Sequence, residues 1–154
     1  MGTSTSGFVT FHACPPHRVR RVFDLLEEYG FADPDDRPSP LALDLDEKYG
    51  KEEPLEAGYA VRLANELVDG APEVAFTAYE EPYEDQLGTT CSYVPGLGKF
   101  TTPCDNYGRA LFGRDEVLAW LALPAEQRAA KLGMPWDAAI AAMPAGSVEE
   151  SADA

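Results

Sequence analysis

Two histidines, a cysteine and an arginine near the N-terminus are the side chains whose types and spacing could do chemistry. They are His12, Cys14, His17 and Arg20. Cys14 and Arg20 fit the Cys-x5-Arg pattern, in which backbone N–H groups of a loop hold a phosphate while the thiolate attacks it. Pro15 and Pro16 have no N–H group to offer, so phosphatase chemistry is disfavoured. A small enzyme site or ligand site at this junction remains an alternative hypothesis, if the four side chains share one pocket.

The spacing of Cys14 and His17 also allows a structural zinc site. Cys91 and Cys104 follow on strands that we expect to be neighbours, so these four residues could form a closed tetrahedral site. Neither Cys91 nor Cys104 belongs to a C-x2-C pair, and isolated cysteines usually behave as small buried hydrophobic residues. We therefore predict no metal and no cofactor, and keep zinc as a weak alternative.

Acidic residues dominate the charge of the chain. Lys and Arg number 12 and Asp and Glu 27, which gives a net charge of −15. Residues 24–56 contain twelve acidic and three basic residues, and residues 66–85 contain seven acidic residues and no basic one. Such a field repels phosphate backbones and attracts basic proteins, so direct nucleic-acid binding is disfavoured.

The leading functional hypothesis is a non-enzymatic accessory protein whose acidic face binds a basic protein partner. Carboxylates spaced like phosphates could also let the protein act as a nucleic-acid mimic. The acidic patch predicted to make this contact consists of Glu66, Asp69, Glu80, Glu81, Glu84 and Asp85.

These side chains need a scaffold, and the first half of the sequence predicts two strands and two helices. Residues 8–13 alternate between apolar and small or polar types, as in a strand. Residues 16–29 place Val19, Val22, Phe23 and Leu26 on one helical face, with Pro16 in the first turn and Gly30 after the end. A half-exposed strand at 41–45 and a helix from about 54 to 68 follow.

The second half predicts a β-meander followed by helices. The expected strands span 74–79, 89–94, 99–103 and 109–112, with turns at 95–98 and 105–108. Helices are expected at 114–123, from Pro124 to residue 132 and from Pro135 onward, the first with Val117, Leu118 and Leu121 facing inward. The order predicts an α+β domain with one layer of helices on a mixed or antiparallel sheet.

A chain of 154 residues is the size of one domain, which we place at residues 1–144. Residues 145–154 are acidic and without periodicity, and we expect them to be disordered. The odd number of cysteines, the absence of a leader pattern and the absence of a long apolar run predict a cytoplasmic protein without a membrane partner. Its oligomeric state stays open.

Four segments within residues 74–143 resemble small acidic proteins encoded on actinobacterial plasmids and phages. They are YEEPYEDQLG at 79–88, SYVPGLGKF at 92–100, CDNYGRALF at 104–112 and LGMPWDAAIAAM at 132–143. Those proteins have no assigned activity, so the resemblance implies a mobile genetic element as the source and transfers no functional residue.

Overall fold

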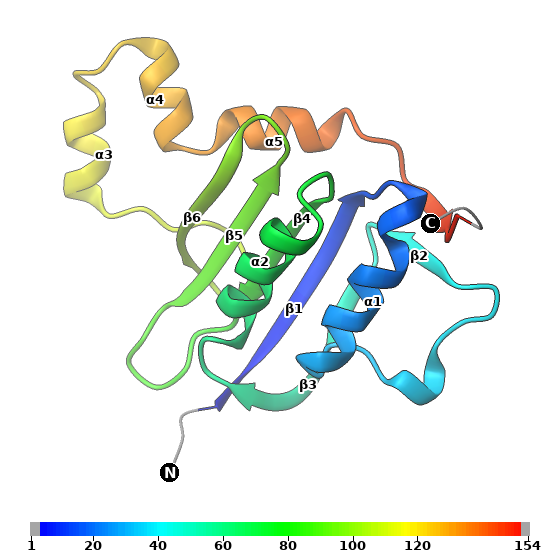
Figure 1. Ribbon diagram of the computed structural model, residues 1–154. Coiled ribbons are helices and arrows are strands. Elements are labelled where there is room, and N and C mark those ends of the chain that lie inside the picture. Colours follow the sequence, from blue (N-terminus) through cyan, green and yellow to red (C-terminus); the bar gives the residue numbers. More distant parts are fainter. Residues whose placement is uncertain (1–3, 152–154) are drawn as a thin grey trace.

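The main architectural feature is a five-stranded antiparallel sheet. The computed structural model describes residues 4–151, with the backbone alone at residue 4 and at 51–55. The strand order is β3-β1-β4-β5-β6 (Figure 1). These strands are β1 (Ser4–Ala13), β3 (Lys48–Glu56), β4 (Ala75–Glu80), β5 (Gly88–Val94) and β6 (Gly98–Cys104). A smaller sheet pairs β2 (Ala42–Leu45) with β7 (Gly146–Glu149).

Two helices cover one face of the main sheet and enclose the core (Figure 1). They are α1 (Val19–Glu28), which follows the short 3-10 helix η1 (Pro16–Arg18), and α2 (Tyr59–Gly70). The predicted apolar face of α1 is buried, as is that of α2. Both faces belong to one hydrophobic core with Phe11 of β1 and Phe76 of β4, which are fully buried neighbours in the sheet. The expected α+β class is confirmed.

The opposite face of the sheet is covered in part by the last helix. The C-terminal helices are α3 (Arg114–Trp120), α4 (Ala125–Lys131) and α5 (Met134–Ala141). Trp136 of α5 stacks on Phe100 of β6, with ring centroids 5.3 Å apart, and its indole N–H donates to the Gly98 carbonyl at 2.9 Å. Helices α3 and α4 stand away from the sheet (Figure 1). Leu118 and Leu121 are therefore 46% and 58% exposed, and the prediction that they face inward is wrong.

Three further elements differ from the predictions. Residues 48–56 form β3, and α2 begins only at Tyr59, because Gly58 adopts a left-handed conformation with φ of +95° between them. Residues 109–112 make one bridge, from Ala110 to Cys104, in place of a fourth meander strand. Residues 146–149 form β7, so the expectation of a disordered tail fails there; residues 152–154 lie outside the described range.

One consequence of β7 is that the small sheet joins distant parts of the sequence. Leu43 of β2 pairs with Val148 of β7, and Leu43 is fully buried in the main core. The Glu150 N–H continues this contact by donating to the Leu41 carbonyl at 2.8 Å. The segment 31–45 is thereby held between α1 and the end of the described chain.

No helix in the described residues has the length and apolar character needed to cross a bilayer.

Candidate functional site

The junction that begins at His12 does not form one pocket. The thiol of Cys14 is buried and donates to the Pro15 carbonyl, whereas the His17 side chain is exposed. Burial, with a smaller contribution from the neighbouring Glu73 carboxylate, raises the pKa of Cys14 to about 12, so the thiol is not a nucleophile at neutral pH. Arg20 pairs with Glu150 at the surface. The alternative enzyme or ligand site built from these four residues is therefore wrong as a group.

The weak zinc candidate is not assembled either. Cys91 of β5 pairs with Thr101 of β6, while Cys104 of β6 pairs with Gly88, which lies three positions before Cys91 on β5. Side chains alternate between the two faces of a strand, so these two thiols lie on opposite faces of the sheet. Within the described residues, no group of three His, Cys, Asp or Glu side chains could hold a metal ion.

The residues of the predicted acidic patch fall into two groups and one exception. Glu66 and Asp69 are exposed on α2, and Glu84 and Asp85 are exposed in the connection between β4 and β5, with Glu81 half-buried beside them. Glu80 is only 6% exposed. Its carboxylate accepts a hydrogen bond from the Ala60 N–H at 3.1 Å, so it belongs to the fold and offers no contact to a partner.

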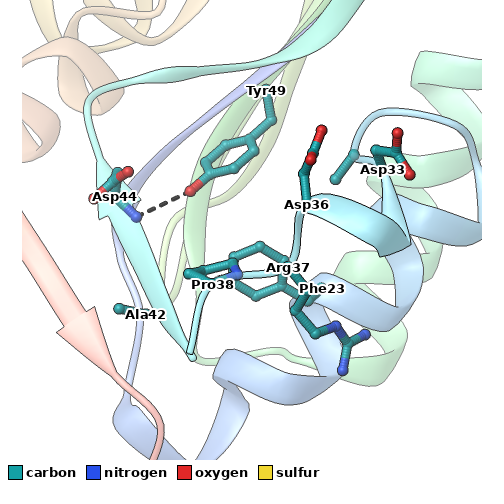
Figure 2. Close-up of a pocket in the computed structure, with 9 residues that line it drawn as sticks. Phe23, Asp33, Asp36, Arg37, Pro38, Ala42, Asp44 and Tyr49 are labelled. Atoms are coloured by element: carbon teal, nitrogen blue, oxygen red, sulfur yellow. Dashed lines mark hydrogen bonds between the residues drawn. The ribbon is translucent and has the colours of Figure 1, made fainter. Parts of the chain in front are cut away.

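A different group of carboxylates surrounds a pocket beside α1 (Figure 2). We call it the aromatic–carboxylate pocket and define it by five lining residues: Phe23, Asp33, Asp36, Asp44 and Tyr49. Its volume is about 350 Å³. Helix α1 contributes the phenylalanine, the loop around the 3-10 helix η2 (Pro34–Asp36) contributes two aspartates, β2 contributes the third, and β3 contributes the tyrosine.

The two aromatic rings that line this pocket are in contact with each other. Phe23 and Tyr49 contact edge to face, with centroids 6.0 Å apart and an interplanar angle of 89°. The Tyr49 hydroxyl accepts a hydrogen bond from the Asp44 N–H at 3.0 Å, which ties β3 to β2 (Figure 2). Burial raises the pKa of Tyr49 above its usual value, partly opposed by that hydrogen bond, so the ring carries a neutral hydroxyl at physiological pH.

Arg37 also lines the pocket, but its guanidinium pairs with carboxylates of α1 outside the pocket. Its guanidinium extends away from Tyr49 and Asp36 (Figure 2). It donates to Glu27 at 2.7 and 2.8 Å and to Asp24 at 2.8 Å, and these hydrogen bonds raise its pKa above the usual range. Among the described side chains, no lysine or arginine lies within ion-pair distance of the pocket's three aspartates.

The pocket suits a cationic side chain. Aromatic rings attract a cation through their negative faces, and exposed carboxylates add charge-assisted hydrogen bonds. One carboxylate is partly committed, because Asp33 accepts from the Asp35 N–H at 2.9 Å at the start of η2. Asp36 and Asp44 are the exposed acids most available to a guanidinium or ammonium group.

The sequence contains only part of the signal for this pocket. The Asp- and Pro-rich loop at 31–40 and the alternating Leu and Asp residues at 41–46 are visible as acidic segments. The contribution of Tyr49 was missed because residues 48–56 were not expected to form a strand, and Phe23 was identified only as a core residue. Their contact depends on packing of α1 against β3, which no local pattern indicates.

Comparison with known proteins adds no functional assignment. No protein-family model, no curated protein and no solved structure matches this chain.

Proposed function

We propose that this protein is an acidic binding protein that recognises a basic protein partner, with an arginine or lysine of the partner inserted into the aromatic–carboxylate pocket. The observation that supports the proposal best is that two aromatic rings in contact lie beside aspartates that form no ion pair with any described lysine or arginine. Sites of this composition bind cations because ring faces and carboxylates both favour positive charge.

The distribution of charge supports the same partner class. Five described arginines are paired within the chain, among them Arg18 with Glu73 and Arg37 with Glu27. The remaining excess of carboxylates gives a field that accelerates encounter with a basic surface. A nucleic-acid-binding protein offers such a surface, and carboxylates that occupy it would exclude its nucleic acid. Mimicry of this kind, in a protein from a mobile genetic element, is part of the proposal.

A salt-dependent pull-down with paired variants tests the proposal. The immobilised protein is exposed to an actinobacterial lysate at about 50 mM and about 500 mM NaCl, which spans strong and weak screening of surface charge. We expect a basic protein to be retained at low salt and released at high salt. The double variant Asp36→Asn/Asp44→Asn should weaken its retention about tenfold or more, since hydrogen bonds to charged groups contribute roughly 1.5–3 kcal/mol each.

The control is Glu84→Gln/Asp85→Asn, which removes the same charge from the other acidic group. It should retain the partner nearly as well as the unmodified protein. Equal losses in both double variants would mean that only net charge matters, and loss in the control alone would place the contact at the β4–β5 connection. A partner that stays bound at high salt, or no partner at all, would contradict an electrostatic interface.

A further inference from the structure

A second cavity lies on the sheet face opposite α1 and α2, where hydroxyl side chains of neighbouring strands line up. Thr77 of β4 pairs with Ser92 of β5, and Thr77 also pairs with Thr10 of β1. The register of β1 against β4 shifts between Phe11 and Ala13, and His12 lies at this irregularity. Its imidazole is thereby placed beside the Thr77 hydroxyl.

His12 is the centre of a continuous hydrogen-bond chain. Its Nδ1 lies 3.3 Å from Oδ1 of Asp46, and its Nε2 lies 2.9 Å from Oγ1 of Thr77. The hydroxyls of Thr77 and Ser92 are 2.9 Å apart. A carboxylate can only accept a hydrogen bond, so the neutral imidazole carries its proton on Nδ1 and receives the Thr77 hydroxyl hydrogen at Nε2.

Asp46, the acidic member of this hydrogen-bond chain, is held in place by its backbone. Asp46 occupies a left-handed conformation with φ of +65°, and its N–H donates to the Phe11 carbonyl at 2.8 Å. The turn between β2 and β3 is thus fixed to β1 next to the imidazole. The His12 side chain is 10% exposed, whereas that of Asp46 is 46% exposed, so the imidazole is shielded and its acid partner is at the protein surface.

Thr77 and Ser92, the hydroxyl members of the hydrogen-bond chain, line a cavity of about 390 Å³. Phe100 of β6 and Ile140 of α5 give it an apolar wall, together with Leu132. Arg109 and Asp137, both exposed, line it as well. The Arg109 Nε donates to Asp105, which partly neutralises that guanidinium. A small neutral molecule with an apolar part suits this lining better than an anion, which the net charge of −15 would repel.

We propose that this cavity hydrolyses small neutral esters, with Thr77 as nucleophile, His12 as general base and Asp46 as a positioning residue. An imidazole hydrogen-bonded to a hydroxyl on one side and a carboxylate on the other is the arrangement that activates a hydroxyl for acyl transfer. A hydrogen-bond chain with a purely structural role would not need an open cavity beside Thr77 and Ser92. Such a cavity gives room for an acyl group.

The reaction balances with water as the only co-reactant. Oγ1 of Thr77 attacks the ester carbonyl while Nε2 of His12 takes its proton. The Ser92 hydroxyl, which donates to Thr77 in the resting protein, turns its hydrogen to the carbonyl oxygen as negative charge develops. The tetrahedral intermediate expels the alcohol, which receives the proton from His12, and leaves an ester of Thr77. Water, deprotonated by His12, then attacks the Thr77 ester. His12 returns the proton to Oγ1 of Thr77 as the carboxylic acid leaves, and the field of the protein repels its anion.

The test uses the full chain with p-nitrophenyl butyrate as substrate. We expect turnover that falls at least about 100-fold in His12→Gln, the range for loss of a general base. The matched control is His17→Gln, which changes the chain's other histidine at an exposed position and should leave the rate unchanged. Asp46→Asn should lower kcat with little change in KM, because the acid orients the base without touching the ester. Equal rates in the unmodified protein and in His12→Gln would overturn the proposal.

A second measurement needs no variant and therefore does not depend on folding of a substituted protein. An alkyl fluorophosphonate should phosphonylate the unmodified protein with loss of fluoride, and peptide mass spectrometry should locate the group on Thr77. Absence of modification, or modification confined to another residue, would overturn the assignment. Neither readout depends on the basic partner, so failure here leaves the pull-down result unaffected and the reverse also holds.

Discussion

Glu80 shows how a residue in an acidic segment can serve the fold. Helix α2 begins after Gly58, which provides no side chain to cap the first N–H groups. The carboxylate of Glu80, at the end of β4, accepts from the Ala60 N–H instead and links the helix to the sheet. A negative charge at a helix N-terminus is also favoured by the helix dipole. From sequence alone, this carboxylate was indistinguishable from its exposed neighbours.

We predict that Glu80→Ala lowers the free energy of unfolding by about 1–2 kcal/mol, the usual effect of losing a helix cap. Glu80→Gln should lower it less, since the amide oxygen still accepts a hydrogen bond. Glu84→Ala is the control at an exposed position and should change it by less than about 0.5 kcal/mol. Urea denaturation measures all three, and equal effects of the two alanine substitutions would contradict the capping role.

The three cysteines are buried and free, and their reactivity follows from that environment. Burial, with smaller contributions from the carboxylates of Asp105 and Glu80, raises the pKa of Cys104 to about 11, and the pKa of Cys14 is raised to about 12. At pH 8 both thiols are therefore protonated and unreactive in the folded protein.

We predict slow reaction of these thiols with a disulfide reagent such as dithionitrobenzoate at pH 8, and fast reaction of all three in about 6 M guanidinium, where the thiol pKa returns to about 8.5. The raised pKa values also predict how the stability of the fold depends on pH. Their contribution is constant below about pH 8.5 and is lost as pH rises toward the folded values, because the unfolded chain releases its protons first. Rapid labelling of the folded protein would contradict the burial of the thiols.

At the scale of elements, periodic segments were predicted well and the edge strand was not. The buried face of α1 follows directly from Val19, Val22 and Leu26, and the turn at 95–98 from its glycines. Strand β3 carries Lys, Glu, Gly and Pro in place of alternating apolar residues. It lies at an edge of the sheet, where charged residues discourage pairing between molecules, so its sequence does not look like that of a strand.

Gly133 joins α4 to α5 and fixes how α5 meets the sheet. Its φ is +76°, and a Cβ at this position would lie 2.5 Å from the Phe100 ring. Gly96 has a φ of +90° with nothing within 4 Å of such a Cβ. We predict that Gly96→Ala costs about 1 kcal/mol of stability through backbone strain alone, and that Gly133→Ala costs about 2–3 kcal/mol because the contact adds to the strain. Thermal melts of both variants compare them, and equal losses would show that α5 adjusts freely.

At the scale of the whole molecule, the charge could be predicted and the candidate site could not. Composition alone gives the acidic field and the expectation of a basic partner. The pocket requires Phe23 of α1, Asp36 of the following loop and Tyr49 of β3 to meet, and those contacts form only when the helix packs on the sheet. The cavity at His12 likewise depends on a register irregularity in β1, which has no signature in the sequence.

The net charge of −15 predicts that salt stabilises the fold. Carboxylates repel one another more strongly in the compact state than in the unfolded chain, and ions screen this repulsion over about 10 Å at 0.1 M. The Tm should rise between about 20 and 200 mM NaCl, by about 2–4 °C for each kcal/mol of repulsion removed. Equal rises in NaCl and KCl would indicate screening, whereas a fall in Tm would show that the internal ion pairs outweigh the repulsion.

The pairing of β2 with β7 has a consequence for synthesis of the chain. β2 supplies Ala42 and Asp44 to the aromatic–carboxylate pocket, but its only strand partner among the described residues is β7, about a hundred positions later. On the ribosome, the main sheet can assemble while residues 146–149 are still inside the exit tunnel. The loop at 31–40 and β2 then reach their final arrangement last, so the centre of a nascent chain would be folded before the aromatic–carboxylate pocket is complete.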